Sequence, residues 1–200
     1  MTFIETVAED EASGATAELY AAEREVWGFL PNLVRALSLR PEVYGAWKQL
    51  NGSIKGGMDL RRYELATIAA ARELRSSYCM LAHGSVLMDK GFLDPDALQA
   101  VVSDHRSAGL DETEVAVMDL AAKVAEDATS VEQADIDRLR SLGLSDQDVL
   151  DVVLAAAARC FFSTVLDALG AEPDAKYGQL DPAVRESLTV GRAIASVQSG

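Results

Sequence analysis

Residues 60–90, LRRYELATIAAARELRSSYCMLAHGSVLMDK, carry two successive helical patterns with one break between them. Asp59 precedes the first pattern, where aspartate is a preferred N-cap, and the apolar stripe that follows predicts a helix over residues 60–75. Ser76 is expected to cap a second helix, which runs to residue 90 and is stopped by Gly91. The stretch therefore predicts two consecutive helices that meet at residues 75–76.

The remainder of the chain continues the helical periodicity. Further helices are expected at residues 15–29, 33–39, from 41 to 52 or 57, from 95, and at 111–127, 131–142 and 145–169. Because β-branched residues never alternate with polar ones over a strand length, the predicted fold class is all-α. An amphipathic tail at 181–198 is expected to pack loosely or to meet a neighbouring subunit.

Bulk composition narrows the class of protein. The chain has 200 residues, 49% of them hydrophobic and 25% charged, which is typical of a globular protein. This length suits one domain or two tightly fused halves, and a single domain over residues 1–200 is expected. A net charge of −14 argues against nucleic acid and anionic membranes as partners. The chain has two cysteines, no basic-then-apolar leader and no unbroken apolar run near the roughly 18 residues of a membrane span. A cytoplasmic location without membrane association is expected.

Three side chains in the opening stretch carry chemistry. Cys79 and His83 are four residues apart, so a helix places them on one face, and Glu64 lies in the preceding helix. If Ser76 is the N-cap, Cys79 lies in the first turn, where free backbone N–H groups and the helix dipole favour a thiolate. His83 can accept the thiol proton, and Glu64 can fix the imidazole tautomer or act as the base. The set predicts an activated cysteine.

Each residue also has a structural interpretation. A cysteine on an alanine-rich helix is often a small buried apolar side chain, and a histidine or glutamate there is often a hydrogen-bonded or ion-paired helix residue. Cys160 lies in an apolar run and is expected in the core, whereas His105 follows a polar segment and is expected to be exposed. One cysteine, one histidine and one glutamate make at most three ligands, so no metal is expected.

The spacing resembles the active-site pattern of the AhpD-like alkylhydroperoxidases in the carboxymuconolactone decarboxylase superfamily. That pattern is Glu, eleven residues, Cys-x-x-Cys, three residues and His, and Glu64, Ser76, Cys79 and His83 occupy its four positions. Two further segments, FLPN at residues 29–32 and LGLSD at residues 142–146, are similar to sequences of the branch usually labelled peroxidase-related. The resemblance covers roughly residues 29–172, with helical extensions at either end.

The resemblance implies an AhpD-like bundle of antiparallel helices that assembles as a homo-oligomer, such as a dimer, trimer or hexamer. It implies no cofactor, a peroxidatic role for Cys79 and a proton relay through His83 and Glu64. Ser76 stands where the family has its resolving cysteine, and a hydroxyl cannot form a disulfide. Reduction of an oxidised Cys79 would then need an external thiol or a thiol elsewhere in the chain, such as Cys160. In compensation, Ser76 can donate a hydrogen bond to a Cys79 thiolate.

Three functions follow as hypotheses. The first is a single-cysteine peroxidase that reduces hydrogen peroxide or small organic hydroperoxides. The second is a decarboxylase or hydrolase of a small carboxylated lactone, with His83 and Glu64 as acid and base. For its anionic substrate, Arg72, Arg75 and Arg159 are the candidate cations. The third is a non-catalytic helical scaffold or redox sensor with a vestigial site.

Overall fold

The two helices expected from residues 60–90 form the centre of the molecule. A computed structural model describes residues 2–196, in which they are α4 (Leu60–Glu73) and α5 (Ser77–Asp89). The Asp59 carboxylate accepts a hydrogen bond from the backbone N–H of Arg62, as expected for an N-cap. Arg75 adopts the left-handed conformation (φ 53°), and the N–H of Ser76 bonds back to the carbonyl of Ala71. This tight cap ends α4 and reverses the chain directly into α5.

Helices form all the regular secondary structure of residues 2–196, as the sequence predicts. The remaining helices are α1 (Gly14–Trp27), α2 (Asn32–Ala36), α3 (Pro41–Gly57), α6 (Pro95–Asp104), α7 (Glu112–Asp127), α8 (Gln133–Ser141), α9 (Asp146–Ala168) and α10 (Pro182–Leu188), with short 3₁₀ helices at Ala128–Ser130 and Ala175–Gln179. Helix α3 continues to the later of its two expected ends, whereas α2 stops three residues early. The two 3₁₀ helices were not expected from the sequence.

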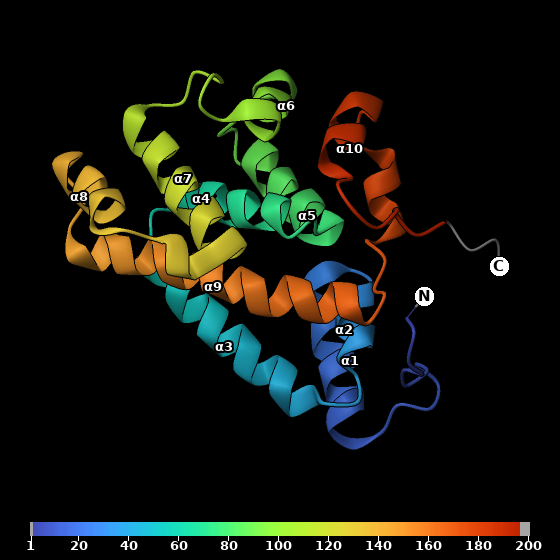
Figure 1. Ribbon diagram of the computed structural model, residues 1–200. Helices are drawn as coiled ribbons and strands as arrows, with labels where there is room; N and C mark the ends of the chain where they lie inside the picture. Colours follow the sequence, from blue (N-terminus) through green and yellow to red (C-terminus); the bar gives the residue numbers. More distant parts are fainter. Residues whose placement is uncertain (1, 197–200) are drawn as a thin grey trace.

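Helix α4 is the buried axis around which the others pack. It contacts α5, α7 and α9, and α3 covers a further side of α9. Figure 1 shows α9 crossing the molecule with α3 along one side and α4, α5 and α7 along the other. The run from Tyr63 to Ala71 is buried throughout, and its alanines let neighbouring helix backbones approach closely. Buried hydrophobic residues from these helices form one continuous core.

The C-terminal segment departs from the expectation of loose packing. Helix α10 packs on α5 and α6, and its Val184 and Leu188 are buried. Leu188 lies directly over Gly84 of α5, where a Cβ atom would come within 3.0 Å of its side chain. The expectation of loose packing was therefore wrong for this segment, because its apolar residues complete the core of their own chain, and contact with a neighbouring subunit stays a prediction. The last part of that prediction, residues 197–198, lies outside the described residues.

Helix α9 is long and apolar enough to pass a test for a membrane span by length and composition. Half of its most apolar window is buried inside the protein, and it contributes Ala155, Ala156 and Phe162 to the core. Core helices of soluble proteins pass the same test, so this property is weak evidence for a membrane.

Candidate active site

Glu64, Cys79 and His83 meet at the crossing of α4 and α5. Cys79 is the third residue of α5, so it lies in the first turn as the sequence predicts, and it is 3% exposed. His83 follows one turn later, and its Nδ1 lies 2.5 Å from Oε2 of Glu64. Glu64 lies in the second turn of α4 and is fully buried. The three residues singled out from spacing therefore share one location, which depends on the tight reversal between the two helices.

The hydrogen bonds of His83 define its tautomer. Nη1 of Arg159 lies 3.0 Å from His83 Nε2, and an arginine can only donate. Nε2 must therefore be the acceptor nitrogen, so Nδ1 carries the hydrogen and donates it to Glu64. Lys55 Nζ, 3.1 Å away, donates to the other carboxylate oxygen of Glu64. Both oxygens of this buried carboxylate are thus satisfied.

Burial and neighbouring charges set the protonation states. Burial lowers the pKa of His83, and the positive charges of Arg159 and Lys55 add to the effect, although the Glu64 carboxylate opposes it. Burial alone would raise the pKa of Glu64, but the hydrogen bonds and charges of His83 and Lys55 outweigh it, and the net direction is down. Glu64 is therefore a carboxylate and His83 a neutral imidazole at neutral pH.

Two residues of α9 complete the surroundings of the sulfur. Ser163 Oγ donates to Cys79 Sγ at 3.1 Å, and Arg159 Nη1 lies 3.9 Å from the same sulfur. The guanidinium also donates to Asn51 and stacks over the ring of Trp47, so several contacts hold it in this resting arrangement. Sequence reasoning named Arg159 only as a candidate cation for a lactone and missed Ser163. Their spacing of four residues, which matches that of Cys79 and His83, was the available signal.

Ser76 takes a different place from the one expected. It is the N-cap of α5 by backbone geometry, but its side chain makes no capping hydrogen bond. Ser76 is fully buried, and its side chain interacts with the Asp167 carboxyl group, where it opposes the rise in pKa that burial causes. The hydroxyl that reaches the Cys79 sulfur belongs to Ser163 instead. The predicted roles of Ser76 as a side-chain cap and as a donor to Cys79 were wrong.

A pocket of about 700 Å³ opens above this cluster. Cys79, His83, Glu64 and Arg159 line its inner part. Aromatic side chains make much of the remaining wall: Trp27, Tyr44, Trp47, Tyr78, Phe162 and Tyr177. A volume of this size is typical of sites for organic ligands. The cluster is therefore accessible to a molecule considerably larger than water.

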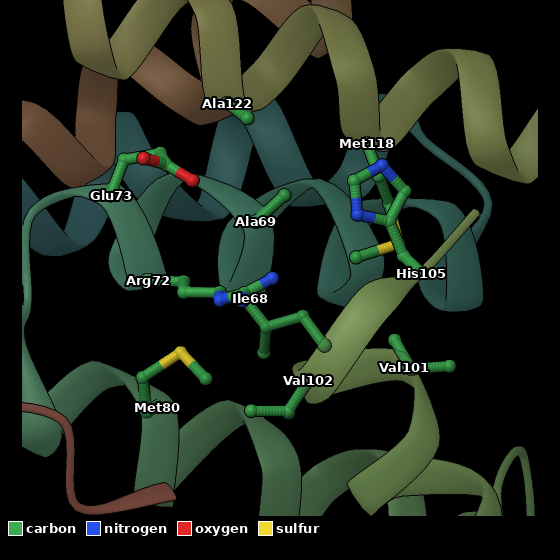
Figure 2. Close-up of a pocket in the computed structure, with 10 residues that line it drawn as sticks. All are labelled: Ile68, Ala69, Arg72, Glu73, Met80, Val101, Val102, His105, Met118 and Ala122. Atoms are coloured by element: carbon green, nitrogen blue, oxygen red, sulfur yellow. The ribbon is translucent and has the colours of Figure 1, made fainter. Parts of the chain in front are cut away.

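His105 lies apart from this pocket and is buried, not exposed as expected. It is 8% exposed, and its Nε2 lies 2.8 Å from a carboxylate oxygen of Asp119. Figure 2 shows His105 beside a second cavity, which Ile68, Met80 and Met118 also line. Its volume of about 10 Å³ has room for about one water molecule. This histidine joins helices and has no space for a substrate.

The other candidates from the sequence fall outside the main pocket. Arg72 donates to the carbonyl of Ser103, and Arg75 to that of Val190, so neither lines the pocket. Cys160 is partly buried, does not line the pocket, and burial raises the pKa of its thiol. Among residues 2–196, no three His, Cys, Asp or Glu side chains gather in a way that could hold a metal ion.

The arrangement of the helices matches that of proteins whose structures are known. No protein-family model and no curated protein matches the sequence. Among solved structures, an uncharacterized peroxidase-related protein with an alkylhydroperoxidase AhpD core, from Ralstonia eutropha, matches with a TM-score of 0.78 and 21% identity. The match covers 88% of this chain and 94% of that one. The chain has an AhpD-like fold. The AhpD-like, all-helical fold that the family resemblance implies is thus confirmed, whereas the implied homo-oligomer stays a prediction.

Two further proteins share the AhpD-like fold. An uncharacterized peroxidase-related protein from a Silicibacter species has a TM-score of 0.74 and 23% identity, covering 88% of this chain and 91% of that one. The debrominase Bmp8, in a cysteine-to-alanine form bound to 2,3,4-tribromopyrrole, has a TM-score of 0.70 and 14% identity, covering 94% and 98%. At these identities the likeness concerns the fold, and proteins that share it differ in activity.

Proposed function

We propose that this protein is a thiol peroxidase that reduces hydroperoxides through Cys79. The observation that carries the proposal is the convergence of Ser163, Arg159 and the His83–Glu64 pair around one buried sulfur. A hydroxyl donor and a guanidinium stabilise a thiolate, and a neutral imidazole can accept the proton that the thiol releases. The names of peroxidase-related proteins with the same fold agree with this chemistry.

The resting hydrogen bonds suggest the order of events. His83 Nε2 accepts from Arg159, so it can take the Cys79 proton only if that donor moves away. The sulfur is 3.9 Å from the same guanidinium nitrogen, and a shift of Arg159 toward it frees Nε2 while stabilising the new thiolate. The thiolate attacks the distal peroxide oxygen, the O–O bond breaks, and the leaving oxygen takes the proton from His83. The products are a Cys79 sulfenic acid and an alcohol or water.

Regeneration is proposed to use an external thiol. Ser76 cannot form a disulfide, and Cys160 lies outside the pocket. One thiol condenses with the sulfenic acid to give a mixed disulfide and water, and a second releases Cys79 as the thiol. The pocket volume of about 700 Å³ is consistent with access by such a reductant. No cofactor enters this cycle.

The direct test is peroxide consumption with dithiothreitol as the reductant. We expect turnover in the parent protein and none above background in Cys79→Ser, because an alcohol has no comparable nucleophilicity. Cys160→Ser is the matched control and should retain the parent rate. Equal activity of Cys79→Ser and the parent would refute the mechanism. If His83→Gln abolished lactone turnover while Cys79→Ala retained it, the lactone hypothesis would replace it.

Reductive dehalogenation is a second candidate, favoured by the aromatic walls and size of the pocket. The pocket is larger and has more aromatic side chains than hydrogen peroxide requires, and a debrominase has the same fold. Release of bromide from 2,3,4-tribromopyrrole in the presence of dithiothreitol would support it, provided that the release depends on Cys79. If the protein reduces peroxide rapidly but releases no bromide, dehalogenation is rejected and the peroxidase remains the proposed function.

We further propose that the chain forms a homo-oligomer through one face of α9. Leu150, Leu154 and Phe161 are large, exposed and spaced to share a helix face, and Leu50 of α3 is exposed as well. Exposed apolar side chains that gather in this way favour burial against a second copy. Light scattering on the parent and on Leu150→Glu should show that the charge dissociates the assembly. A monomeric parent would contradict the proposal.

A further inference from the structure

The lining of the main pocket differs in charge from the rest of the protein. The chain carries a net charge of −14, yet the pocket wall has four cations, Lys48, Lys55, Arg159 and Lys176, against three carboxylates. An acidic protein that concentrates cations around an apolar cavity creates a local potential favourable to anions. The lining therefore combines aromatic surface for an apolar body with positive charge for an acidic group.

The four cations are not equivalent. Lys48 is ion-paired with Glu23, and Lys55 with Glu64. Arg159 is committed to His83 and Asn51 beside the sulfur. The ammonium of Lys176 is held instead over aromatic rings, 4.9 Å from the centroid of Trp27 and 5.0 Å from that of Tyr177. Cation–π contacts position an ammonium but do not neutralise its charge.

Lys176 is also accessible. It lies on the short helix Ala175–Gln179, is exposed, and lines the pocket together with its neighbour Tyr177. Asp174, two residues earlier, is buried, and burial raises the pKa of its carboxyl group, although the hydrogen bond from Tyr78 and the nearby charge of Lys176 oppose the shift. Asp174 receives hydrogen bonds from the hydroxyl of Tyr78 and the N–H of Asn32, which anchor the start of this segment. The ammonium is thus held over the pocket by a fixed piece of backbone.

We propose that the pocket binds aromatic carboxylates, with the carboxylate on Lys176 and the ring among the aromatic walls. The binding of an aromatic carboxylate is inferred from the pocket alone. The presence of a hydroperoxide group on the same molecule rests on the proposed peroxidase function. With that function, the substrate class is an aromatic hydroperoxide that bears a carboxylate, and its peroxide group points toward Cys79. The inner Arg159 stays with the sulfur and His83, so the anion binds at the lysine and not beside the thiolate.

Binding is measurable without turnover. The only two tryptophans of the chain, Trp27 and Trp47, both line the pocket, so their fluorescence reports on occupancy. The probes are 4-isopropylbenzoate and its neutral match 4-isopropylbenzamide, titrated into the full chain with calorimetry in parallel. We expect the benzoate to bind up to about fivefold more tightly, because an ion pair with a solvent-exposed lysine contributes about that much.

Lys176→Gln tests the residue assignment, and Lys90→Gln is the matched control because Lys90 is exposed and does not line the pocket. We expect Lys176→Gln to reduce the benzoate affinity to that of the amide and Lys90→Gln to change neither affinity. Equal binding of the two probes by the parent overturns the inference. So does a preference for the benzoate that survives in Lys176→Gln.

Turnover separates this inference from the proposed function. The hydroperoxides to compare are cumene hydroperoxide and its para-carboxylate, and kcat/KM should favour the carboxylate in the parent by a similar factor. If neither is reduced but the benzoate preference depends on Lys176, the proposed function fails and the binding inference stands. If both hydroperoxides are reduced equally and the protein binds the benzoate no more tightly than the amide, the binding inference fails and the peroxidase stands.

Discussion

The two histidines of this chain have similar immediate contacts but different surroundings. His83 bonds to Glu64 and has Arg159 beside it, and His105 bonds to Asp119, which also pairs with Arg106 and Arg138. Both imidazoles are largely buried. The space around them differs, since His83 lines a pocket of about 700 Å³ and His105 lines a cavity of about 10 Å³.

The comparison separates a structural polar network from a reactive one. Around His105, the carboxylate of Asp119 ties α6, α7 and α8 together, and the cavity beside this histidine (Figure 2) has a volume of only about 10 Å³. Around His83, the same kind of carboxylate–imidazole–arginine contact ends at a sulfur that faces a pocket. A hydrogen-bonded histidine is therefore functional here because of the nucleophile and the space next to it.

Replacement of each histidine should give the largest contrast in activity. We expect His83→Gln to lower kcat/KM for hydroperoxide by about 10²- to 10⁴-fold, the usual contribution of a general acid–base group. His105→Gln should stay within about twofold of the parent, since no substrate reaches it. Steady-state peroxide consumption measures both. A comparable loss in His105→Gln would break the distinction between the two networks.

Replacement of the two arginines should give the next largest contrast. Arg159→Met removes a charge-assisted donor from the sulfur and from His83, and we expect a loss of about tenfold to hundredfold in kcat/KM. Alkylation of Cys79 by iodoacetamide should slow in parallel, which a purely structural arginine would not cause. Arg138→Met, in the His105 network, should alter neither rate. An unchanged alkylation rate in Arg159→Met would remove Arg159 from the mechanism.

The pH dependence of stability should report on the burial of His83. The folded-state pKa of His83 is lowered by burial, so below its unfolded value of about 6.5 the unfolded chain binds a proton that the folded protein excludes. The free energy of unfolding therefore falls as the pH drops from about 7 through this window. His83→Gln should flatten that slope in urea titrations. The idea fails if the slope in His83→Gln equals that of the parent.

The smallest expected effect concerns stability alone. Asp119→Asn weakens the bonds from His105, Arg106 and Arg138, and we expect a loss of about 1–2 kcal/mol in the free energy of unfolding. Peroxide consumption by the folded variant should be unchanged. Urea denaturation followed by circular dichroism measures the first quantity. A loss of activity without a loss of stability would show that the His105 network communicates with the pocket.

Local signals in the sequence predict much of this fold. The Asp59 cap, the Pro41 start and the periodic apolar stripes place the helices within a few residues, because these effects act over one or two turns. The tail was misjudged because the burial of Leu188 depends on Gly84, a residue more than a hundred positions away. His105 was misjudged for the same reason, as its partner Asp119 belongs to another helix.

For the candidate site, the sequence by itself determined that Cys79 and His83 share a helix face and that Glu64 belongs to the helix before them. Helical periodicity fixes such neighbours without any tertiary contact. Only the tertiary structure decided that Ser163, and not Ser76, is the hydroxyl at the sulfur, and that Arg159 lies between thiol and imidazole. These contacts depend on how α9 packs across α4 and α5, and packing joins residues some eighty positions apart whose spacing carries no periodic signal.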